Sequence, residues 1–290
     1  MPNLCVIILN YFSPNNTEAC VSSLVDQEFD TLYLIDNSAD AHQAQCINSL
    51  ANKLRDQDIK FKIIVLISKE NLGFGAGINS AIKHDYQQSG GHELYLLLNN
   101  DTVLPSNTIK VLLEEKQKDP EIALLSPKIE WGGRDISYYG YIEFLGHVSS
   151  YPKKFAQPYV SGCCLLVDSE LIDSDHTLFD DAFFMYGEDI YLNWKAKQQG
   201  KQIYCTDKVT IFHEGSGSSS HGGLFYEYHV ARGHVLLGLK VNRPLYKKIA
   251  YILGRVFYLF MRGCLRSVRY RSVIPLQAYF MAWLPIKVRI

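Results

Sequence analysis

The sequence has 290 residues with a hydrophobic content of 47%, which is ample for a folded core and excludes a disordered chain. The formal net charge is only −1, but it is divided by position. From Tyr228 onward there are 12 Lys and Arg and no acidic residue, whereas the preceding part has 17 basic against 30 acidic residues, a net charge of −13. The chain therefore combines an acidic body with a basic tail.

The cysteines and the amino terminus indicate a compartment. The seven cysteines are odd in number and none stands in a C-x-x-C pair, so neither a disulfide framework nor a zinc site is favoured. The apolar run 4–9 is too short for the core of a signal peptide, and no basic residue precedes it. We therefore expect a reduced, cytoplasmic setting and no secretion signal.

The first hundred residues alternate two kinds of segment. Short β-type runs are found at 4–9, 32–35, 61–67 and 94–98, and longer helical stretches at 15–28, 40–56 and 74–88. Strands separated by helices predict crossover connections and a mostly parallel central sheet in a three-layer α/β/α sandwich. Ligands of such sheets bind at the carboxyl ends of the strands.

The next segments are less regular. A helix is predicted over 107–118, ending near Asp119 and Pro120, and a strand over 122–127. The stretch 131–159 is rich in Gly and Tyr, and we expect an irregular, mobile loop over the site there.

The four predicted strands all end in polar residues. These ends are Asn10, Asp36, the segment 71–79 (NLGFGAGIN) and the Asn99, Asn100, Asp101 run. Each alone is ordinary turn chemistry, and Asp36 beside Asn37 and Ser38 equally suits an Asx turn. Four in succession favour a polar ligand spanning the sheet edge. Asp36 would accept a hydrogen bond from a base or a ribose.

The glycines of segment 71–79 suggest close approach of the backbone to that ligand, because a Cβ would clash there. Their spacing is G-x-G-x-G after the third strand, whereas a dinucleotide-binding fingerprint is G-x-G-x-x-G after the first. A Rossmann oxidoreductase is therefore a poor fit.

The ordered motifs resemble one family. Asn10, LIDNS (34–38), NLGFGAGIN, NND (99–101), SGCCLLV (161–167), GED (187–189) and His213 together are similar to family 2 glycosyltransferases, especially the rhamnosyltransferase-like branch. The resemblance covers residues 4 to about 215 and implies a GT-A-like fold and a nucleotide-sugar donor. The donor-binding residues that it implies are Asn10, Asp36, Asn71, Gly73, Gly77, Asn79, Asn100, Ser161 and Gly162.

Two residues are candidates for holding a divalent cation. Asp101 supplies a hard oxygen of the kind that Mg²⁺ and Mn²⁺ prefer, and it is the one carboxylate left where the family usually has Asp-x-Asp. By resemblance, His213 lies near the metal and the diphosphate, although a histidine at a strand end also suits a structural role.

Glu188 and Asp189 are the candidate catalytic residues. Adjacent carboxylates at a helix start also suit the helix dipole. An attacking sugar hydroxyl needs a group that accepts its proton. The resemblance makes Asp189 that base, with Glu188 positioning the acceptor or the base. The chain departs from the family pattern at Tyr191 and Lys195, which bears on acceptor recognition.

The tail, residues 228–290, is predicted to associate with a membrane surface. Its apolar runs 245–261 and 273–286 are interrupted by Arg255 or bounded by prolines, so no span across a membrane is expected. Basic residues among aromatic ones suit an anionic membrane, with Phe257, Phe280 and Trp283 inserted. A nucleic-acid patch or a helical pair docked on the body are the alternatives.

These features predict a catalytic domain (1–227), the helical tail and an inverting glycosyltransferase at the inner face of a bacterial plasma membrane. The expected donor is dTDP-rhamnose or a UDP-sugar, the acceptor a lipid-linked or cell-surface glycan, the cofactor Mg²⁺ or Mn²⁺, and no nucleic acid is expected as a partner. A non-catalytic scaffold on this fold is an alternative. A nucleotidyltransferase is a weaker one, because residues 10–14 supply neither Gly nor Lys for a triphosphate loop.

Overall fold

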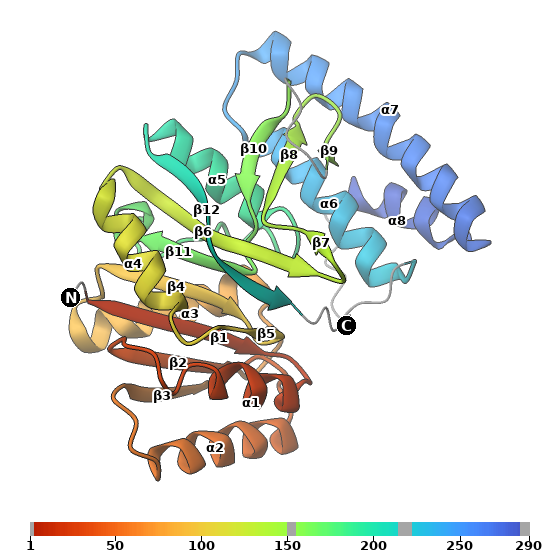
Figure 1. The fold of residues 1–290 in the computed structure, drawn as a ribbon. Helices are drawn as coiled ribbons and strands as arrows, with labels where there is room; N and C mark the ends of the chain where they lie inside the picture. Colours follow the sequence, from red (N-terminus) through yellow and green to blue (C-terminus); the bar gives the residue numbers. More distant parts are fainter. Residues whose placement is uncertain (1–2, 150–154, 214–221, 285–290) are drawn as a thin grey trace.

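The computed structural model describes residues 3–149, 155–213 and 222–284 (Figure 1). Within them a central sheet of nine strands has the order β3-β2-β1-β4-β11-β6-β12-β5, with β7 paired to β6. Its parallel half consists of β1 (Leu4–Asn10), β2 (Thr31–Asp36), β3 (Lys62–Ile67) and β4 (Leu94–Asn99). The other half is mixed and consists of β5 (Thr102–Val103), β6 (Ile122–Trp131), β11 (Cys164–Asp168) and β12 (Gln202–His213).

Helices cover both faces of this sheet and bury almost every residue of β1, β2 and β4. One apolar core lies between the sheet and α1 (Pro14–Ser22), α2 (Ala41–Arg55) and α4 (Thr108–Lys118). The other lies between the sheet and α3 (Phe74–Ser89) and α5 (Glu188–Gln198). Strand β1 divides its side chains between the two cores, because successive residues of a strand point to opposite faces. The predicted three-layer α/β/α sandwich is confirmed.

Helix α1 is shorter than predicted, ending at Ser22 instead of continuing to residue 28. Side chains after it bond to the neighbouring loop. Ser23 Oγ donates to Cys20 O (2.6 Å) and accepts from Leu104 N (3.1 Å), and Gln27 Nε2 donates to Pro105 O (3.0 Å). These bonds take the place of the next helical turn and connect the end of α1 to the loop before α4.

The stretch 131–159 is not the irregular loop that was predicted. It contains β7 (Arg134–Asp135), β8 (Tyr138–Ile142), β9 (His147–Ser149) and β10 (Gln157–Val160), of which the last three form a second, antiparallel sheet. Tyr141 and Tyr159 are buried against Phe183 and Ile190. This burial orders a segment whose sequence lacks the regular alternation of a strand. Residues 150–154 lie outside the described part.

The carboxyl-terminal helices are α6 (Leu224–Lys240), α7 (Leu245–Tyr270) and α8 (Ile274–Ala282), and a 3₁₀ turn, η1 (Ser169–Leu171), follows β11. Helices α7 and α8 pack on α6. Residue 228, the predicted domain limit, lies inside α6. Gly233 of α6 is so close to the loop before α5 that a Cβ on it would lie 2.2 Å from Tyr186 O. Among the described helices, none has the apolar length needed to cross a bilayer.

A buried ionic cluster joins α6 to α7. The Glu227 side chain is fully buried and accepts hydrogen bonds from Arg262 Nη1 (3.1 Å) and from Arg266 Nε and Nη2 (2.8 and 2.5 Å). Removing one partner of such a cluster leaves uncompensated buried charge.

We therefore expect Glu227→Ala to lower the free energy of unfolding by about 3 kcal/mol. The matched control is Glu18→Ala, which breaks an exposed ion pair with Lys53 (2.6 Å) and should change stability by less than about 1 kcal/mol. Urea denaturation of the purified proteins measures both values. Equal effects of the two substitutions would contradict a structural role of the cluster.

Candidate active site

The ends of the parallel strands are aligned by the register of the sheet. Asn10 pairs with Asp36, Asp36 with Ile67, and Leu9 with Asn99. The carboxyl ends of four neighbouring strands therefore meet at one edge of the sheet, on the right of β1 to β4 in Figure 1. The structure thus brings the predicted polar strand ends together.

Asn10 and Asp36 form the centre of a buried hydrogen-bond network. Asn10 Nδ2 donates to Asp36 Oδ1 (3.0 Å), which also accepts from Ser38 N (3.2 Å). The second carboxyl oxygen, Asp36 Oδ2, is buried and has no hydrogen-bond partner in the structure. A buried acceptor left without a donor is unfavourable, and the N–H or O–H of a ligand would satisfy it.

The network continues to Asn100 through Thr17, which was not among the predicted site residues. Thr17 Oγ1 donates to Asn10 Oδ1 (2.9 Å) and accepts from Asn100 Nδ2 (2.9 Å). Thr17 lies on α1, and in the sequence it looks like any other polar residue of a helix. It fixes the orientation of both amides.

Asn37 builds the turn that carries Asn71 and Gly73. Its Nδ2 donates to Asn71 Oδ1 (3.0 Å) and to Gly73 O (3.1 Å), and its Oδ1 accepts from Leu72 N (3.0 Å). In the sequence, Asn37 suggests only a turn after Asp36. Its side chain instead attaches segment 71–73 to the end of β2.

The glycines of segment 71–79 pack against protein atoms, which is a reason for their presence that the sequence did not reveal. A Cβ on Gly73 would lie 2.2 Å from Phe184 O, and one on Gly77 would lie 2.4 Å from Leu9 Cδ1. Gly73 also has a φ of +82°, which favours glycine. These glycines allow α3 to pack closely on the sheet and on the loop before α5.

Asn79 likewise bonds within the protein. Its Nδ2 donates to Phe179 O (2.8 Å) and Asp181 Oδ1 (2.9 Å), and its Oδ1 accepts from Leu178 N (2.9 Å). The whole amide therefore holds segment 178–181, and any effect of Asn79 on a donor would be exerted through that segment.

Asp101 and His213 lie together, as the metal prediction requires. The antiparallel pairing of β5 with β12 sets His213 opposite Thr102, and His213 Nε2 is 3.1 Å from Asp101 Oδ1. Among the described residues, His213 Nδ1 has no hydrogen-bond partner, and it is buried. One carboxylate and one imidazole fit a divalent cation that takes its other ligands from phosphate and water. The segment 214–221 that follows His213 lies outside the described residues.

Glu188 and Asp189 form the first turn of α5, after a loop with positive φ at Tyr186 (66°) and Gly187 (96°). Glu188 Oε2 is buried and without a hydrogen-bond partner, whereas Asp189 is partly exposed. Burial and the neighbouring Asp189 charge raise the pKa of Glu188 to about 8. Burial also raises the pKa of Asp189 to about 6, against hydrogen bonds from the backbone of Ile190 and Gly162.

The turn at residues 161–163 connects this carboxyl pair to the sheet edge. Cys163 O accepts from Asn99 N (2.8 Å) at the end of β4, and a Cβ on Gly162 would lie 3.4 Å from Asp189 Cβ. Ser161 Oγ accepts from Cys163 N (3.3 Å) and stabilises the turn. The turn therefore contacts both the end of β4 and Asp189.

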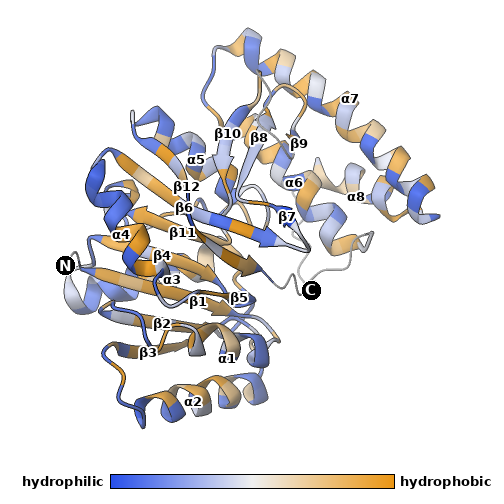
Figure 2. Cartoon of the chain, viewed as in Figure 1, coloured by the Kyte–Doolittle hydropathy of each residue, from blue (hydrophilic) through white to orange (hydrophobic). Residues whose placement is uncertain are grey.

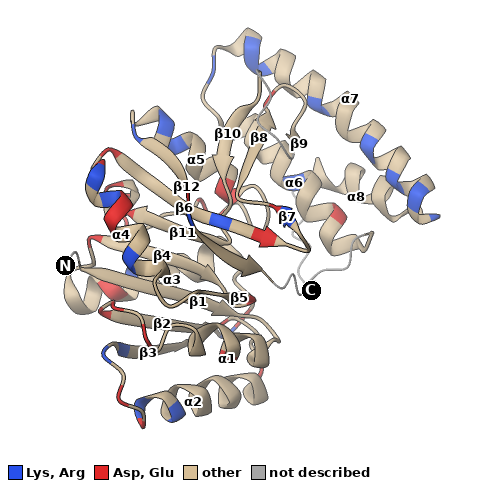
Figure 3. Ribbon diagram, in the orientation of Figure 1, with Lys and Arg blue, Asp and Glu red and all other residues tan. Residues whose placement is uncertain are grey.

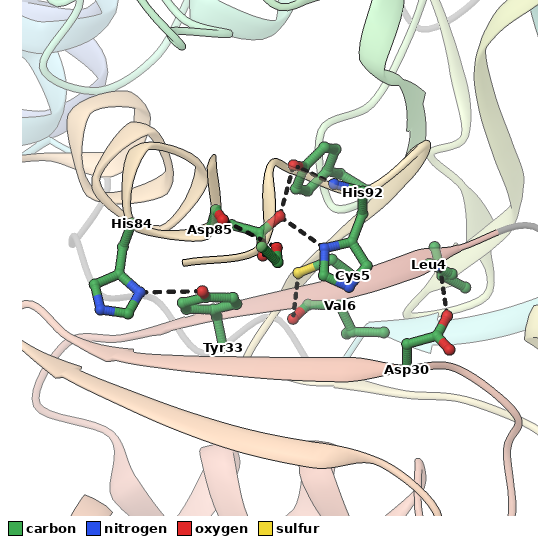
Figure 4. A network of polar contacts seen from close by, with 10 residues as sticks. Leu4, Cys5, Val6, Asp30, Tyr33, His84, Asp85 and His92 are labelled. Carbon is green, nitrogen blue, oxygen red and sulfur yellow. Dashed lines mark hydrogen bonds and ion pairs between the residues drawn. The ribbon is translucent and has the colours of Figure 1, made fainter. Parts of the chain in front are cut away.

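A second cluster with metal-binding chemistry lies elsewhere. The ligand atoms of Cys5, Asp85 and His92 are within 4.8 Å of one another, so these three buried residues form a possible metal site. Asp85 Oδ2 already accepts from His92 Nδ1 (2.7 Å), as Figure 4 shows. It also accepts from Tyr95 Oη (2.7 Å). Cys5 is five residues before Asn10 on β1, about 17 Å along the strand. This cluster is therefore separate from Asp101 and His213.

Comparison with solved structures identifies the fold. The mannosyltransferase PcManGT from Pyrobaculum calidifontis in complex with GDP-Man and Mn²⁺ is 12% identical (TM-score 0.57, covering 97% of this chain and 85% of that chain). S. aureus TarS 1-349 is 16% identical (TM-score 0.58, 97% and 80%). GalNAc-T7 with UDP, GalNAc and Mn²⁺ is 14% identical (TM-score 0.60, 94% and 58%). The fold is therefore that of the GT-A glycosyltransferases.

The sequence itself gives the family. The profile of glycosyl transferase family 2 matches residues 5–175, more than half of the chain. A search of curated proteins finds no match. The protein belongs to glycosyl transferase family 2 and is a glycosyltransferase.

Calorimetry of UDP binding in the presence of Mn²⁺ distinguishes the two candidate metal sites. Asp101→Asn should weaken Mn²⁺-dependent UDP binding about tenfold or more, because it removes the carboxylate next to His213. The control, Asp85→Asn, changes the Cys5 cluster and should leave this binding unchanged. The opposite pattern, with Asp85 sensitive and Asp101 insensitive, would place the cation away from the strand ends.

Proposed function

We propose that this family 2 enzyme is an inverting glycosyltransferase that moves a sugar from a nucleoside diphosphate donor to a hydroxyl of a lipid-linked or cell-surface glycan. One observation supports this most strongly: the turn at 161–163 contacts both the end of β4 and Asp189. A donor at the strand ends and an acceptor next to Asp189 would then be neighbours. Direct displacement of the diphosphate by the acceptor hydroxyl requires this arrangement.

The donor would bind across the ends of β1 to β4. Asp36 Oδ2 is the available acceptor for an N–H or O–H of the nucleoside. Phe12 lies beside this network with an exposed ring, and its backbone N–H donates to Ser38 Oγ (2.9 Å). Asn10, Asn71, Asn100, Ser161 and the glycines would shape the site. Among donors we favour dTDP-rhamnose, from the rhamnosyltransferase-like pattern of motifs, followed by UDP-sugars.

The two carboxyl groups would act differently because their environments differ. Asp189, with a pKa raised by burial to about 6, is ionised at neutral pH and is suited to accept the proton of the attacking hydroxyl. Glu188, with its pKa raised to about 8, stays protonated there and would position the acceptor or Asp189. Asp101 and His213 would hold Mg²⁺ or Mn²⁺, which would stabilise the leaving diphosphate.

The acceptor and location are part of the same proposal. The enzyme would work at the inner face of a bacterial plasma membrane, in the synthesis of a surface polysaccharide such as O-antigen or capsule. The basic tail supports this, since an acidic body alone would be repelled by anionic lipid.

A donor panel tests the proposal. The purified protein is incubated with Mn²⁺ or Mg²⁺, glycan acceptors and either dTDP-rhamnose or a UDP-sugar, and release of the nucleoside diphosphate is measured. A transferase releases dTDP or UDP in proportion to glycan product, with inverted anomeric configuration by NMR. A scaffold releases nothing, and a nucleotidyltransferase instead releases pyrophosphate from a nucleoside triphosphate.

Asp189→Asn should lower kcat about 10²-fold or more with little change in donor KM, because it removes the proton acceptor and keeps the shape. In the native enzyme kcat should rise with pH through about 6, where Asp189 loses its proton, and then level off. Glu188→Gln is the matched control. It mimics the protonated acid and should lower kcat much less at neutral pH. An Asp189→Asn variant with native turnover and pH profile would exclude Asp189 as the base.

A further inference from the structure

Helix α7 presents its apolar face outward. Its exposed apolar side chains between Leu245 and Val268, which we call the outer stripe, recur at intervals of three and four residues, as at Ile249, Leu253, Phe257 and Phe260. Leu253 and Phe257 are 63% and 67% exposed. Residues at this spacing share one side of a helix, so the outer stripe is continuous. Over 26 residues the helix is about 39 Å long.

The polar face of the same helix is turned toward the body. Arg255 is 1% exposed, and its guanidinium donates to the backbone oxygens of Glu143 and His234. Arg262 and Arg266 bond to the buried Glu227. A surface helix normally buries its apolar stripe and exposes its charges. The reversed orientation of α7 leaves an exposed apolar surface much larger than scattered single residues, which marks an interaction site.

The charges next to the outer stripe distinguish between possible partners. Within described residues 228–284, six of the ten basic side chains bond to the protein, whereas Lys247, Lys248, Arg269 and Arg271 have no acidic side chain within ion-pair distance. These four lie near the two ends of α7, and the sequence has no acidic residue after Glu227 (Figure 3). A second copy would bring like charges together, whereas an anionic lipid surface is complementary.

We infer that the outer stripe lies in the interfacial layer of an anionic membrane, with α7 parallel to the bilayer plane. Phe280 of α8 is exposed and its ring centroid is 6.4 Å from that of Phe260, so it extends this surface. Hydrophobic residues recur along α7 in Figure 2. Trp283, which the sequence suggested would insert, is partly buried beside Ala231, Tyr279 and their neighbours and does not belong to this surface. The outer stripe would be the surface that carries the membrane association proposed above, and this role does not depend on the proposed catalysis.

Flotation of the full chain with vesicles of phosphatidylcholine containing about one third phosphatidylglycerol tests the inference. A chain truncated at residue 228 is unsuitable, because α6 supports the loop before Glu188. The native protein should float with these vesicles and bind neutral phosphatidylcholine less. Leu253→Glu with Phe257→Glu should weaken binding about tenfold or more. The control, Tyr204→Glu, changes an exposed aromatic residue on β12 (41% exposed), away from the outer stripe, and should bind like the native protein.

Two further measurements decide the mode of binding. Six of the ten described basic side chains of the tail are bonded internally, so binding should largely persist in about 1 M salt, where the Debye length is about 3 Å. In a Leu253→Trp variant the fluorescence should shift to the blue on vesicle addition, and this reporter needs no disruptive charge. No flotation and no shift, or a dimer in solution that the double substitution dissociates, would overturn the inference. Donor cleavage in detergent-free solution should be unaffected by the double substitution, so failure of the catalytic proposal would be seen separately.

Discussion

Strands that are buried on both faces can carry polar side chains only where they end, and the site depends on this constraint. In β1, β2 and β4 every residue before the last contributes to one of two apolar cores or is buried with them. Asn10, Asp36 and Asn99 are the first positions in these strands where a polar side chain is possible. The parallel register places these three residues side by side. The close packing of Gly73 and Gly77 keeps α3 and the loop before α5 against this edge. The glycines therefore serve the site through packing.

The contacts of the tail change the expected balance between charge and apolar contact in membrane binding. Twelve basic residues suggest an electrostatic anchor, with each cation at an anionic surface contributing about 1 kcal/mol. Six of them bond within the protein, including Arg255 and the two arginines on Glu227. Full burial of one Leu or Phe side chain contributes about 1.5–3 kcal/mol, and the outer stripe offers several. Apolar contact should therefore dominate, with charge selecting the lipid.

The sequence predicted what is encoded locally and missed what depends on distant contacts. Apolar runs ending in Asn or Asp identified β1, β2 and β4 and their ends, because burial and turn chemistry are both visible in a few residues. Thr17 and Asn37 were missed because their roles depend on partners from other elements. The strands within 131–159 were missed because packing against Phe183 and α5 orders them. Periodicity shows that α7 has two faces but not which one contacts the body.

We propose that the strand ends bind a nucleoside diphosphate through the unsatisfied oxygen of Asp36. Calorimetry of UDP and dTDP binding to the native protein and to Asp36→Asn tests it most directly. The asparagine keeps the oxygen that accepts from Asn10 Nδ2 and has an NH₂ group, a hydrogen-bond donor, in place of Oδ2. The account predicts a folded variant, with an unchanged thermal midpoint within a few degrees, that binds at least one of the nucleotides about tenfold or more weaker. Equal binding by both proteins, or no binding of either nucleotide by the native protein, would contradict it.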